Sequence, residues 1–141
     1  MSGAENSDNA GSQFEDDKVI NLLFVCSMNK WRSPTAEEIY AKHELINARS
    51  RGTSKKAVRR VNADDLKWAD IVFVMESKHR QQLQSRFPGE TKYTEIHVLD
   101  IPDDYQFMDP ELIQMIQDFV DLMKAHRGDM VINITSAVVR P

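Results

Sequence analysis

Residues 19–34 read VINLLFVCSMNKWRSP. The segment Val19–Val25 is apolar apart from one asparagine, which is the pattern of a strand buried on both faces of a parallel sheet. Ser33 and Pro34 then indicate a helix start, because a serine hydroxyl accepts from free helical N–H groups and proline needs no N–H at the first helical position. We therefore predict a buried strand, a short loop and a helix over 34–43.

Strand and helix patterns alternate along the rest of the chain. Pro88 and Gly89 are expected to end one of the helices. The further predicted strands are 45–51, 70–75 and 95–99, the further helices are 62–69, 77–87 and 109–123, and an irregular stretch covers 100–108. The alternation predicts an α/β fold: a single three-layer domain with a central parallel sheet of about four strands and helices on both faces. Ligands of such sheets bind beyond the carboxyl ends of the strands. The loops of interest are therefore 26–33, 52–61, 75–77 and 100–108.

Length and composition exclude several classes of protein. The chain has 141 residues, enough for one domain, and its apolar share of 41% and charged share of 28% are those of a globular protein. The longest apolar run, Leu22–Cys26, is far too short to span a membrane, and no secretory signal is visible. The single cysteine and four scattered histidines offer neither a disulfide framework nor a metal-ligand spacing. We expect a cytoplasmic protein without metal or cofactor.

The charge is concentrated at the N-terminus. Residues 1–18 contain five acids and one base, a net charge of −4, so the remainder of the chain is neutral. This segment is poor in apolar residues and is predicted to be a disordered acidic tail, either a solvated leader or an interaction arm. The folded domain is expected to span 19–127. The C-terminal extension over 128–141 has no predicted role.

The loop after the first strand contains the one constellation that carries chemistry. Cys26 ends the strand, and Arg32 and Ser33 open the helix. A loop of this length can turn successive N–H groups inward to cradle an anion, and the helix N-terminus adds positive potential. A cysteine in that field is expected to have a lowered pKa and to be nucleophilic, while the arginine can bind two phosphate oxygens. The serine can donate a hydrogen bond to the sulfur. The remaining residues of the cradle are Ser27, Met28, Asn29, Lys30 and Trp31.

The segment Val25–Glu37, read as VCSMNKWRSPTAE, resembles the phosphate-binding loop of the low-molecular-weight protein tyrosine phosphatases. The resemblance covers most of residues 19–126. It continues in the turn Arg51–Thr53 and in the strand Ala69–Met75. It implies this family's fold, with Cys26 as the nucleophile.

A second motif resembles the general-acid loop of the same family. Asp100-Ile101-Pro102-Asp103-Asp104-Tyr105 matches its lead and places Asp103 at the position of the general acid and Tyr105 beside the pocket. Asp100 and Asp104 are the alternatives for the acid.

The sequence also departs from the family pattern. Met28 replaces a usual glycine, Trp31 stands where a second, protective cysteine often lies, and Asp104 replaces a proline. These differences predict a bulkier pocket wall and no redox protection by a neighbouring cysteine.

The resemblance implies hydrolysis of phosphotyrosine or aryl phosphate monoesters through a cysteinyl-phosphate intermediate, with Asp103 as general acid and then base. The expected partners are a phosphotyrosine protein or a small phosphomonoester, with inorganic phosphate or another oxyanion in the loop, and neither nucleic acid nor membrane. Two other functions stay open: a phosphate- or phosphotyrosine-binding module with little turnover, and a thiol-dependent arsenate reductase. Thiol-dependent arsenate turnover, or tight phosphate binding with negligible hydrolysis, would distinguish them.

Two further features are predicted to shape the pocket mouth. A basic run without any acid could bind an acidic or multiply phosphorylated partner, or could simply be solvated. It consists of Arg49, Arg51, Lys55, Lys56, Arg59 and Arg60. Trp31 and Tyr105 could flank a phosphorylated aromatic ring, although Trp31 could instead anchor the loop in the core.

Overall fold

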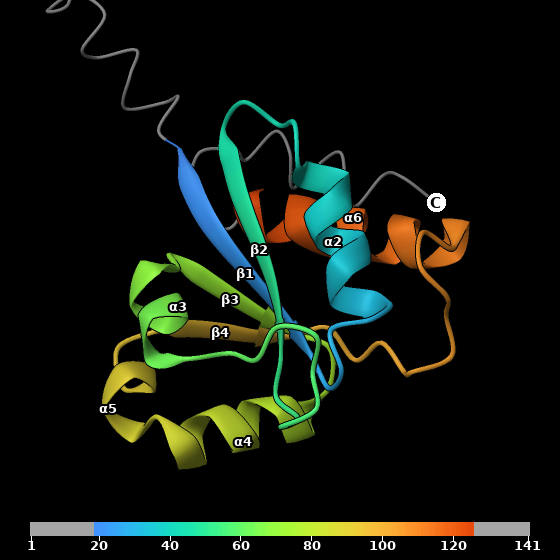
Figure 1. Cartoon of the computed structure of the whole chain (residues 1–141). Helices are drawn as coiled ribbons and strands as arrows, with labels where there is room; N and C mark the ends of the chain where they lie inside the picture. Colours follow the sequence, from blue (N-terminus) through green and yellow to red (C-terminus); the bar gives the residue numbers. More distant parts are fainter. Residues whose placement is uncertain (1–18, 126–141) are drawn as a thin grey trace, which may run out of the picture.

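The computed structural model describes residues 19–125, which form a parallel sheet enclosed by helices (Figure 1). Its four strands lie in the order β2-β1-β3-β4, and every neighbouring pair is parallel. They are β1 (Ile20–Cys26), β2 (Ile46–Gly52), β3 (Ile71–Val74) and β4 (Glu95–Val98). The α/β class, the parallel sheet and its strand number are thus as the sequence predicts. The predicted acidic tail and C-terminal extension lie outside the described residues.

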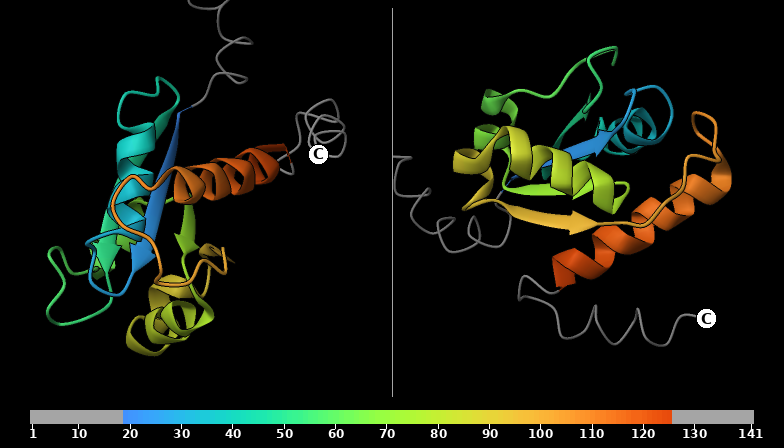
Figure 2. Two further views of the ribbon diagram at one scale, coloured as in Figure 1. Left: turned by 90° about the vertical axis from the view of Figure 1, so that its right-hand side faces the viewer. Right: turned by 90° about the horizontal axis from the view of Figure 1, so that it is seen from below.

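The helices divide between the two faces of the sheet. They are α2 (Arg32–Tyr40), α3 (Ala63–Trp68), α4 (Ser77–Arg86), α5 (Pro88–Thr91) and α6 (Pro110–Lys124). Buried side chains of α2 and α6 pack with one face of the sheet, and those of α3 and α4 pack with the other. In the right-hand view of Figure 2, β4 accordingly lies between α4 and α6. The predicted three layers are confirmed.

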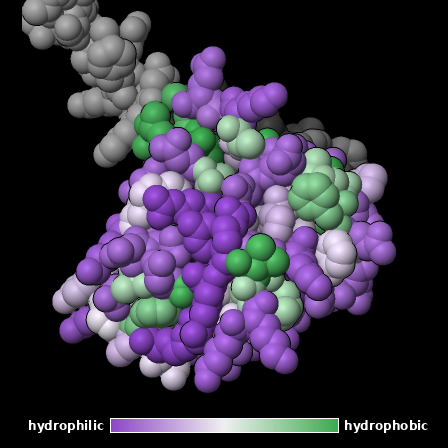
Figure 3. All heavy atoms as spheres, in the orientation of Figure 1, coloured by the Kyte–Doolittle hydropathy of each residue, from purple (hydrophilic) through white to green (hydrophobic). Residues whose placement is uncertain are grey.

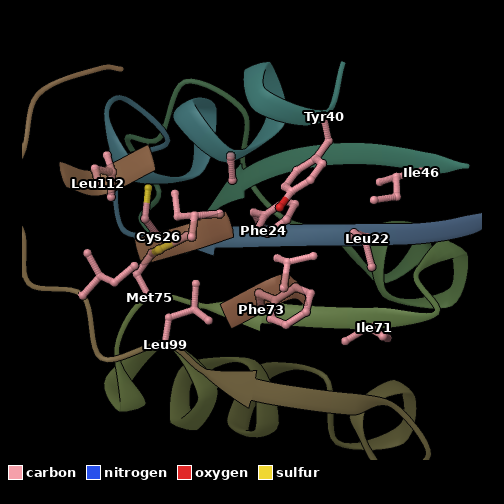
Figure 4. Packing of buried hydrophobic residues seen from close by; sticks show 14 residues of the cluster. Leu22, Phe24, Cys26, Tyr40, Ile46, Ile71, Phe73, Met75, Leu99 and Leu112 are labelled. Atoms are coloured by element: carbon pink, nitrogen blue, oxygen red, sulfur yellow. The ribbon is translucent and has the colours of Figure 1, made fainter. Parts of the chain in front are cut away.

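The central strand β1 explains the uninterrupted apolar run. Leu22 and Phe24 point into the cluster beneath α2 and α6, whereas Leu23 and Val25 point into the cluster beneath α3 and α4. The Phe24 ring is stacked on Phe73, with 5.4 Å between the ring centroids (Figure 4). A strand that is covered on both faces has no room for polar alternation.

Two helix boundaries differ from the sequence prediction. Helix α2 begins at Arg32 rather than Pro34, and Ser33 does not cap it: Trp31 occupies the N-cap without a side-chain hydrogen bond. Pro34 is tolerated as the third helical residue because the first N–H groups of a helix have no intrahelical partners. The pair Pro88–Gly89 was expected only to end a helix. It also begins the short helix α5, since proline suits the first turn.

The carboxyl ends of all four strands meet at one edge of the sheet. At this edge β1 leads into the loop that begins at Cys26, and β3 leads into Met75 and Glu76. The segment after β4 is tied to the same place, because the Ile101 N–H donates to the Met75 carbonyl at 2.9 Å. None of the helices within residues 19–125 combines the length and the hydropathy needed to cross a bilayer.

Candidate active site

The backbone of the loop after β1 is held from outside by the segment that follows β2. The carbonyls of Cys26, Ser27 and Met28 accept from the N–H groups of Thr53, Ser54 and Val58 at 2.9, 3.0 and 3.0 Å. In a trans peptide the N–H points opposite to the C=O. The next N–H group in each case is therefore turned inward, which is the arrangement that cradles an oxyanion.

Gly52, the last residue of β2, allows this close approach. A Cβ atom at this position would lie 2.5 Å from the Ser27 carbonyl oxygen and 2.5 Å from the Ala57 Cβ atom. Real Cβ atoms do not come so close to other heavy atoms. The glycine in the predicted turn Arg51–Thr53 is thus required by the packing of the loop against the end of β2.

Asn29 is a frame for the loop rather than part of the cavity wall. Its backbone is left-handed (φ 57°), which asparagine tolerates better than most residues, and its side chain is buried. Its Nδ2 donates to the Ser33 and Ser50 hydroxyls at 3.0 and 2.9 Å, and its Oδ1 accepts from Arg59 Nε at 3.3 Å. The amide therefore fixes the loop to α2, to β2 and to the segment after β2.

Cys26 lies at the base of the cavity, and Ser33 lies against its sulfur. The Sγ and Oγ atoms are 3.0 Å apart, and Asn29 Nδ2 donates to the same hydroxyl. The hydroxyl has one proton, for which the Arg51 carbonyl at 3.3 Å competes. With the sulfur as thiolate, an acceptor only, that proton belongs to the Ser33–Cys26 bond.

Arg32 is fully buried and its guanidinium is fixed along one edge. Nη1 donates to Glu76 Oε1 at 2.9 Å and to the Ile101 carbonyl at 2.8 Å. Partial desolvation opposes ionisation of Glu76, but the hydrogen bond and charge of Arg32 outweigh it and lower the pKa of Glu76. The carboxylate therefore stays ionised and keeps the arginine charge paired, as a buried cation requires.

Asp103 approaches the other side of the guanidinium. Its Oδ1 lies 3.6 Å from Arg32 Nε, and its side chain is 61% exposed. The other candidates for the acid are placed differently. Asp100 and Asp104 are exposed, and neither lines the cavity.

These groups enclose a cavity of about 190 Å³ at the end of the sheet. It is lined by Cys26, Met28, Lys30, Trp31, Arg32 and Asp103. Trp31 is 44% exposed, so it forms part of the rim and does not anchor the loop in the core. Tyr105 is half-buried against the main core, with its hydroxyl 3.5 Å from Glu111 Oε2, and does not line the cavity.

The ten predicted site residues thus fall into three groups. Six line the cavity, as described above. Ser27, Asn29 and Ser33 do not line the cavity. Their side chains form the hydrogen bonds that hold the loop in place. Tyr105 lies apart from both groups.

His79 supports the cysteine loop, and no sequence motif predicts this role. It is fully buried, and its Nε2 lies 2.8 Å from the Ser27 hydroxyl while its Nδ1 accepts from the Glu76 N–H at 3.0 Å. Because Nδ1 accepts, the neutral ring carries its proton on Nε2 and donates it to Ser27. Burial and the charge of Arg32 lower the pKa of His79 to about 4, so the ring is neutral at physiological pH.

Arg59 also escapes prediction as a site residue, although the basic run includes it. Its Nη2 donates to Glu37 Oε1 and to the Ser50 hydroxyl, both at 2.8 Å, and its Nε reaches Asn29. The same Glu37 oxygen accepts from the Ser50 N–H at 2.9 Å and from its hydroxyl at 2.6 Å. Glu37 and Ser50 lie 22 and 9 residues from Arg59 in sequence, so no local pattern links the three side chains.

The arrangement provides a sulfur, a guanidinium, a carboxylate and inward-turned N–H groups around one small cavity. Such a set can attack an electrophilic centre, hold its anionic oxygens and exchange a proton with it. Within residues 19–125, no cluster of three or more histidine, cysteine, aspartate or glutamate side chains could hold a metal ion.

Several solved structures with this fold are phosphatases. No protein-family model and no curated protein sequence matches this chain. The YwlE arginine phosphatase from Geobacillus stearothermophilus superposes with a TM-score of 0.61 at 20% identity, covering 77% of this chain and 95% of its own. The tyrosine phosphatase Wzb from Escherichia coli K30, in complex with phosphate, superposes with a TM-score of 0.62 at 16% identity. The match covers 78% of this chain and 99% of Wzb. SP-PTP, a low molecular weight protein tyrosine phosphatase from Streptococcus pyogenes, superposes with a TM-score of 0.59 at 19% identity. The match covers 75% of this chain and 93% of SP-PTP. The chain therefore has the fold of the low-molecular-weight protein tyrosine phosphatases.

Proposed function

We propose that this protein is a phosphatase that hydrolyses aryl phosphate monoesters, phosphotyrosine in proteins among them, through a cysteinyl-phosphate intermediate. One observation carries the proposal: Cys26 and Arg32, at the two ends of one loop, line the same small cavity as Asp103, which comes from the distant segment after β4. The fold shared with known phosphatases supports it.

In the first step the Cys26 thiolate attacks phosphorus in line with the ester oxygen, so a P–S bond forms as the P–O bond breaks. The inward-turned N–H groups and the guanidinium of Arg32 hold the nonbridging oxygens, whose charge they meet without reorganisation. Protonated Asp103 donates its proton to the leaving oxygen. Ser33 donates to the sulfur, which stabilises the thiolate before attack and again when sulfur leaves.

In the second step a water molecule attacks the cysteinyl phosphate. Asp103, now a carboxylate, takes a proton from that water, the P–S bond breaks and inorganic phosphate is released. Asp103 is protonated again and Cys26 is again a thiolate, so the cycle closes. Glu76 and Ile101 hold Arg32 throughout the cycle. They do not compete with the phosphate, because they bind only the Nη1 atom of the guanidinium.

The rim of the cavity favours an aromatic ester. Trp31 is 44% exposed beside the cavity. It offers a flat apolar surface against which the ring of a phosphorylated tyrosine can pack. This part of the proposal is separable from the chemistry of the cysteine.

The test is hydrolysis of para-nitrophenyl phosphate across pH 5–8 with chelator present, by wild type and by Cys26→Ser. We expect turnover that resists chelator and is lost in the serine variant, and a phosphoenzyme trapped by rapid acid quench of the wild type. Turnover that survives in Cys26→Ser would contradict the mechanism. Tight phosphate binding without turnover in the reduced, folded wild type would favour a binding module instead.

Two further assays separate the related activities. Matched phosphotyrosine and phosphoarginine peptides should differ in kcat/KM in favour of phosphotyrosine, and the opposite order would overturn the aryl preference while retaining the cysteine mechanism. Thiol-dependent reduction of arsenate that exceeds phosphatase turnover would favour a reductase.

A further inference from the structure

A second cavity, of about 540 Å³, lies between the segment after β2 and helix α4. Its lining consists of Thr53, Lys55, Arg60, Lys78, Gln81, Gln82, Ser85 and Arg86. We call it the basic groove, because four of these side chains are cationic, the others are neutral and polar, and none is acidic. Hydrophilic side chains dominate the lower part of the face in Figure 3, where α4 and the segment after β2 lie in Figure 1.

The cations of the basic groove are poorly neutralised by the protein itself. Within residues 19–125, the side chains of Lys55 and Arg60 make no hydrogen bond or ion pair. Lys78 Nζ lies 3.7 Å from Glu76 Oε1, the same oxygen that Arg32 Nη1 binds at 2.9 Å. Four positive charges with one shared carboxylate leave a net attraction for anions.

Three other members of the predicted basic run behave differently. Arg49 and Arg51 both pair with Asp65, at 3.2 and 3.1 Å, and Arg59 pairs with Glu37 at 2.8 Å. These three arginines serve the fold. The basic run is therefore divided: three arginines are used internally, Lys55 and Arg60 face the groove, and Lys56 is exposed outside it.

Arg86 shows that the charges of the groove act on one another. Its Nη1 donates to the Thr53 carbonyl at 2.6 Å, which fixes the guanidinium at the junction of α4 and the segment after β2. Partial burial and then the charge of Arg60 lower the pKa of Arg86. Two guanidiniums that repel each other are stabilised by an anion bound between them.

The basic groove adjoins the candidate active site through shared backbone. Thr53 lines the groove, and its N–H donates to the carbonyl of Cys26 at 2.9 Å. Lys78 also lines it, and the next residue, His79, holds the Ser27 hydroxyl. One wall of the groove thus carries a residue that contacts the cysteine loop, and the other wall carries the chain neighbour of such a residue. A chain whose phosphorylated residue enters the small cavity can lay its neighbouring residues along these walls.

We propose that the basic groove binds the acidic flank of a phosphorylated protein substrate, a segment with aspartate, glutamate or a second phosphorylated residue beside the one that is hydrolysed. This proposal rests on the proposed function and names its substrate class. A single-stranded nucleic acid is less suited, because none of the described residues that line the groove has an aromatic side chain to stack on bases.

The experiment compares two phosphotyrosine peptides, one with acidic flanks and one in which each flanking acid is replaced by its amide. The variants of the full chain are Lys55→Glu/Arg60→Glu and, as a milder pair, Lys55→Gln/Arg60→Gln. Lys42→Glu is the matched control, an exposed lysine just after α2 and outside both cavities. Thermal unfolding of each variant shows that it is folded.

We expect wild type to prefer the acidic peptide, as a ratio of kcat/KM, by about tenfold at low salt, and this ratio to shrink as salt rises. The ratio should fall to unity or below in the charge-reversed pair, fall partly in the amide pair and stay at the wild-type value in Lys42→Glu. An equal ratio in wild type and in both pairs would overturn the proposal.

Two readouts keep this inference apart from the proposed function. Hydrolysis of para-nitrophenyl phosphate, which has no flank, reports on the phosphatase chemistry alone. Anisotropy of the labelled acidic peptide with the full-length Cys26→Ser variant reports on the groove without turnover. Binding that weakens about tenfold in the charge-reversed background supports the groove, and binding that does not change overturns it. Tighter binding of a single-stranded oligonucleotide than of the acidic peptide would also overturn it.

Discussion

The carboxylate of Asp103 lies 3.6 Å from Nε of Arg32, at the mouth of the cavity that Cys26 also lines. The arginine comes from the start of α2 and the aspartate from the loop after β4, so the fold alone brings them together. The neighbouring Asp104 does not line this cavity. The position of Asp103 gives the general-acid hypothesis its sharpest test.

The first prediction concerns this choice of acid. Asp103→Asn should lower kcat by about 10²–10⁴-fold, the range for loss of a positioned acid, and should remove one limb of the pH–rate profile. Asp104→Asn, one residue along in the same exposed loop, should change kcat little. Steady-state kinetics with para-nitrophenyl phosphate measure both. Equal losses in the two variants would refute the assignment of Asp103.

The second prediction concerns the support of Arg32. Glu76→Gln retains a hydrogen-bonding oxygen but removes the charge that pairs with the buried guanidinium. We expect kcat/KM to fall about tenfold and inhibition by inorganic phosphate to weaken, because the guanidinium is less firmly oriented. Glu38→Gln, on the exposed side of α2, is the control. Unchanged kinetics in Glu76→Gln would mean that the Ile101 carbonyl suffices to hold Arg32.

The sequence predicts those parts of the site that depend on local pattern. The apolar run of β1, the cysteine at its end and the arginine at the start of α2 are contiguous, and strand and helix periodicities place them at one edge of the sheet. Asn62, the first residue of the predicted helix 62–69, is of a residue type favoured at N-caps, and it forms a capping box with Asp65. Such features need only neighbouring residues.

The parts that escape prediction depend on contacts between distant segments. The sequence predicts Ser33 as a helix cap. In the structure its hydroxyl instead contacts the sulfur of Cys26 and accepts a hydrogen bond from the amide of Asn29. His79 has no motif context, and its role arises only because α4 packs its ring beneath Ser27, 52 residues away. Tyr105 was expected beside the pocket, yet its ring packs against the core that α6 completes.

The third prediction concerns stability against pH. His79 has a folded-state pKa of about 4, below its ordinary value of 6.5, so acid protonates the unfolded chain first. Its contribution is complete above pH 6.5 and is lost as the pH falls towards 4, by roughly 3 kcal/mol at the lower end. The free energy of unfolding, from urea titrations between pH 7 and 4, should decline more steeply in wild type than in His79→Gln. His43→Gln, on an exposed turn, should keep the wild-type slope, and parallel curves for wild type and His79→Gln would exclude this role.

The fourth prediction concerns the glycine behind the cysteine loop. In Gly52→Ala the new methyl group would meet the Ser27 carbonyl and Ala57, each 2.5 Å from the ideal Cβ position, so backbone must move. Overpacking of this kind costs about 1–3 kcal/mol, and here the displaced backbone belongs to the anion cradle. We therefore expect both a lower free energy of unfolding and a loss of kcat.

The chain contains its own control for this substitution. A Cβ on Gly89 would meet nothing within 4 Å, so Gly89→Ala introduces the same methyl group into open space. It should leave kcat unchanged and alter the free energy of unfolding by less than about 1 kcal/mol. Urea unfolding and para-nitrophenyl phosphate kinetics on the two variants give the comparison. If Gly52→Ala were as stable and as active as Gly89→Ala, the contact between β2 and the cysteine loop would not be what shapes the cradle.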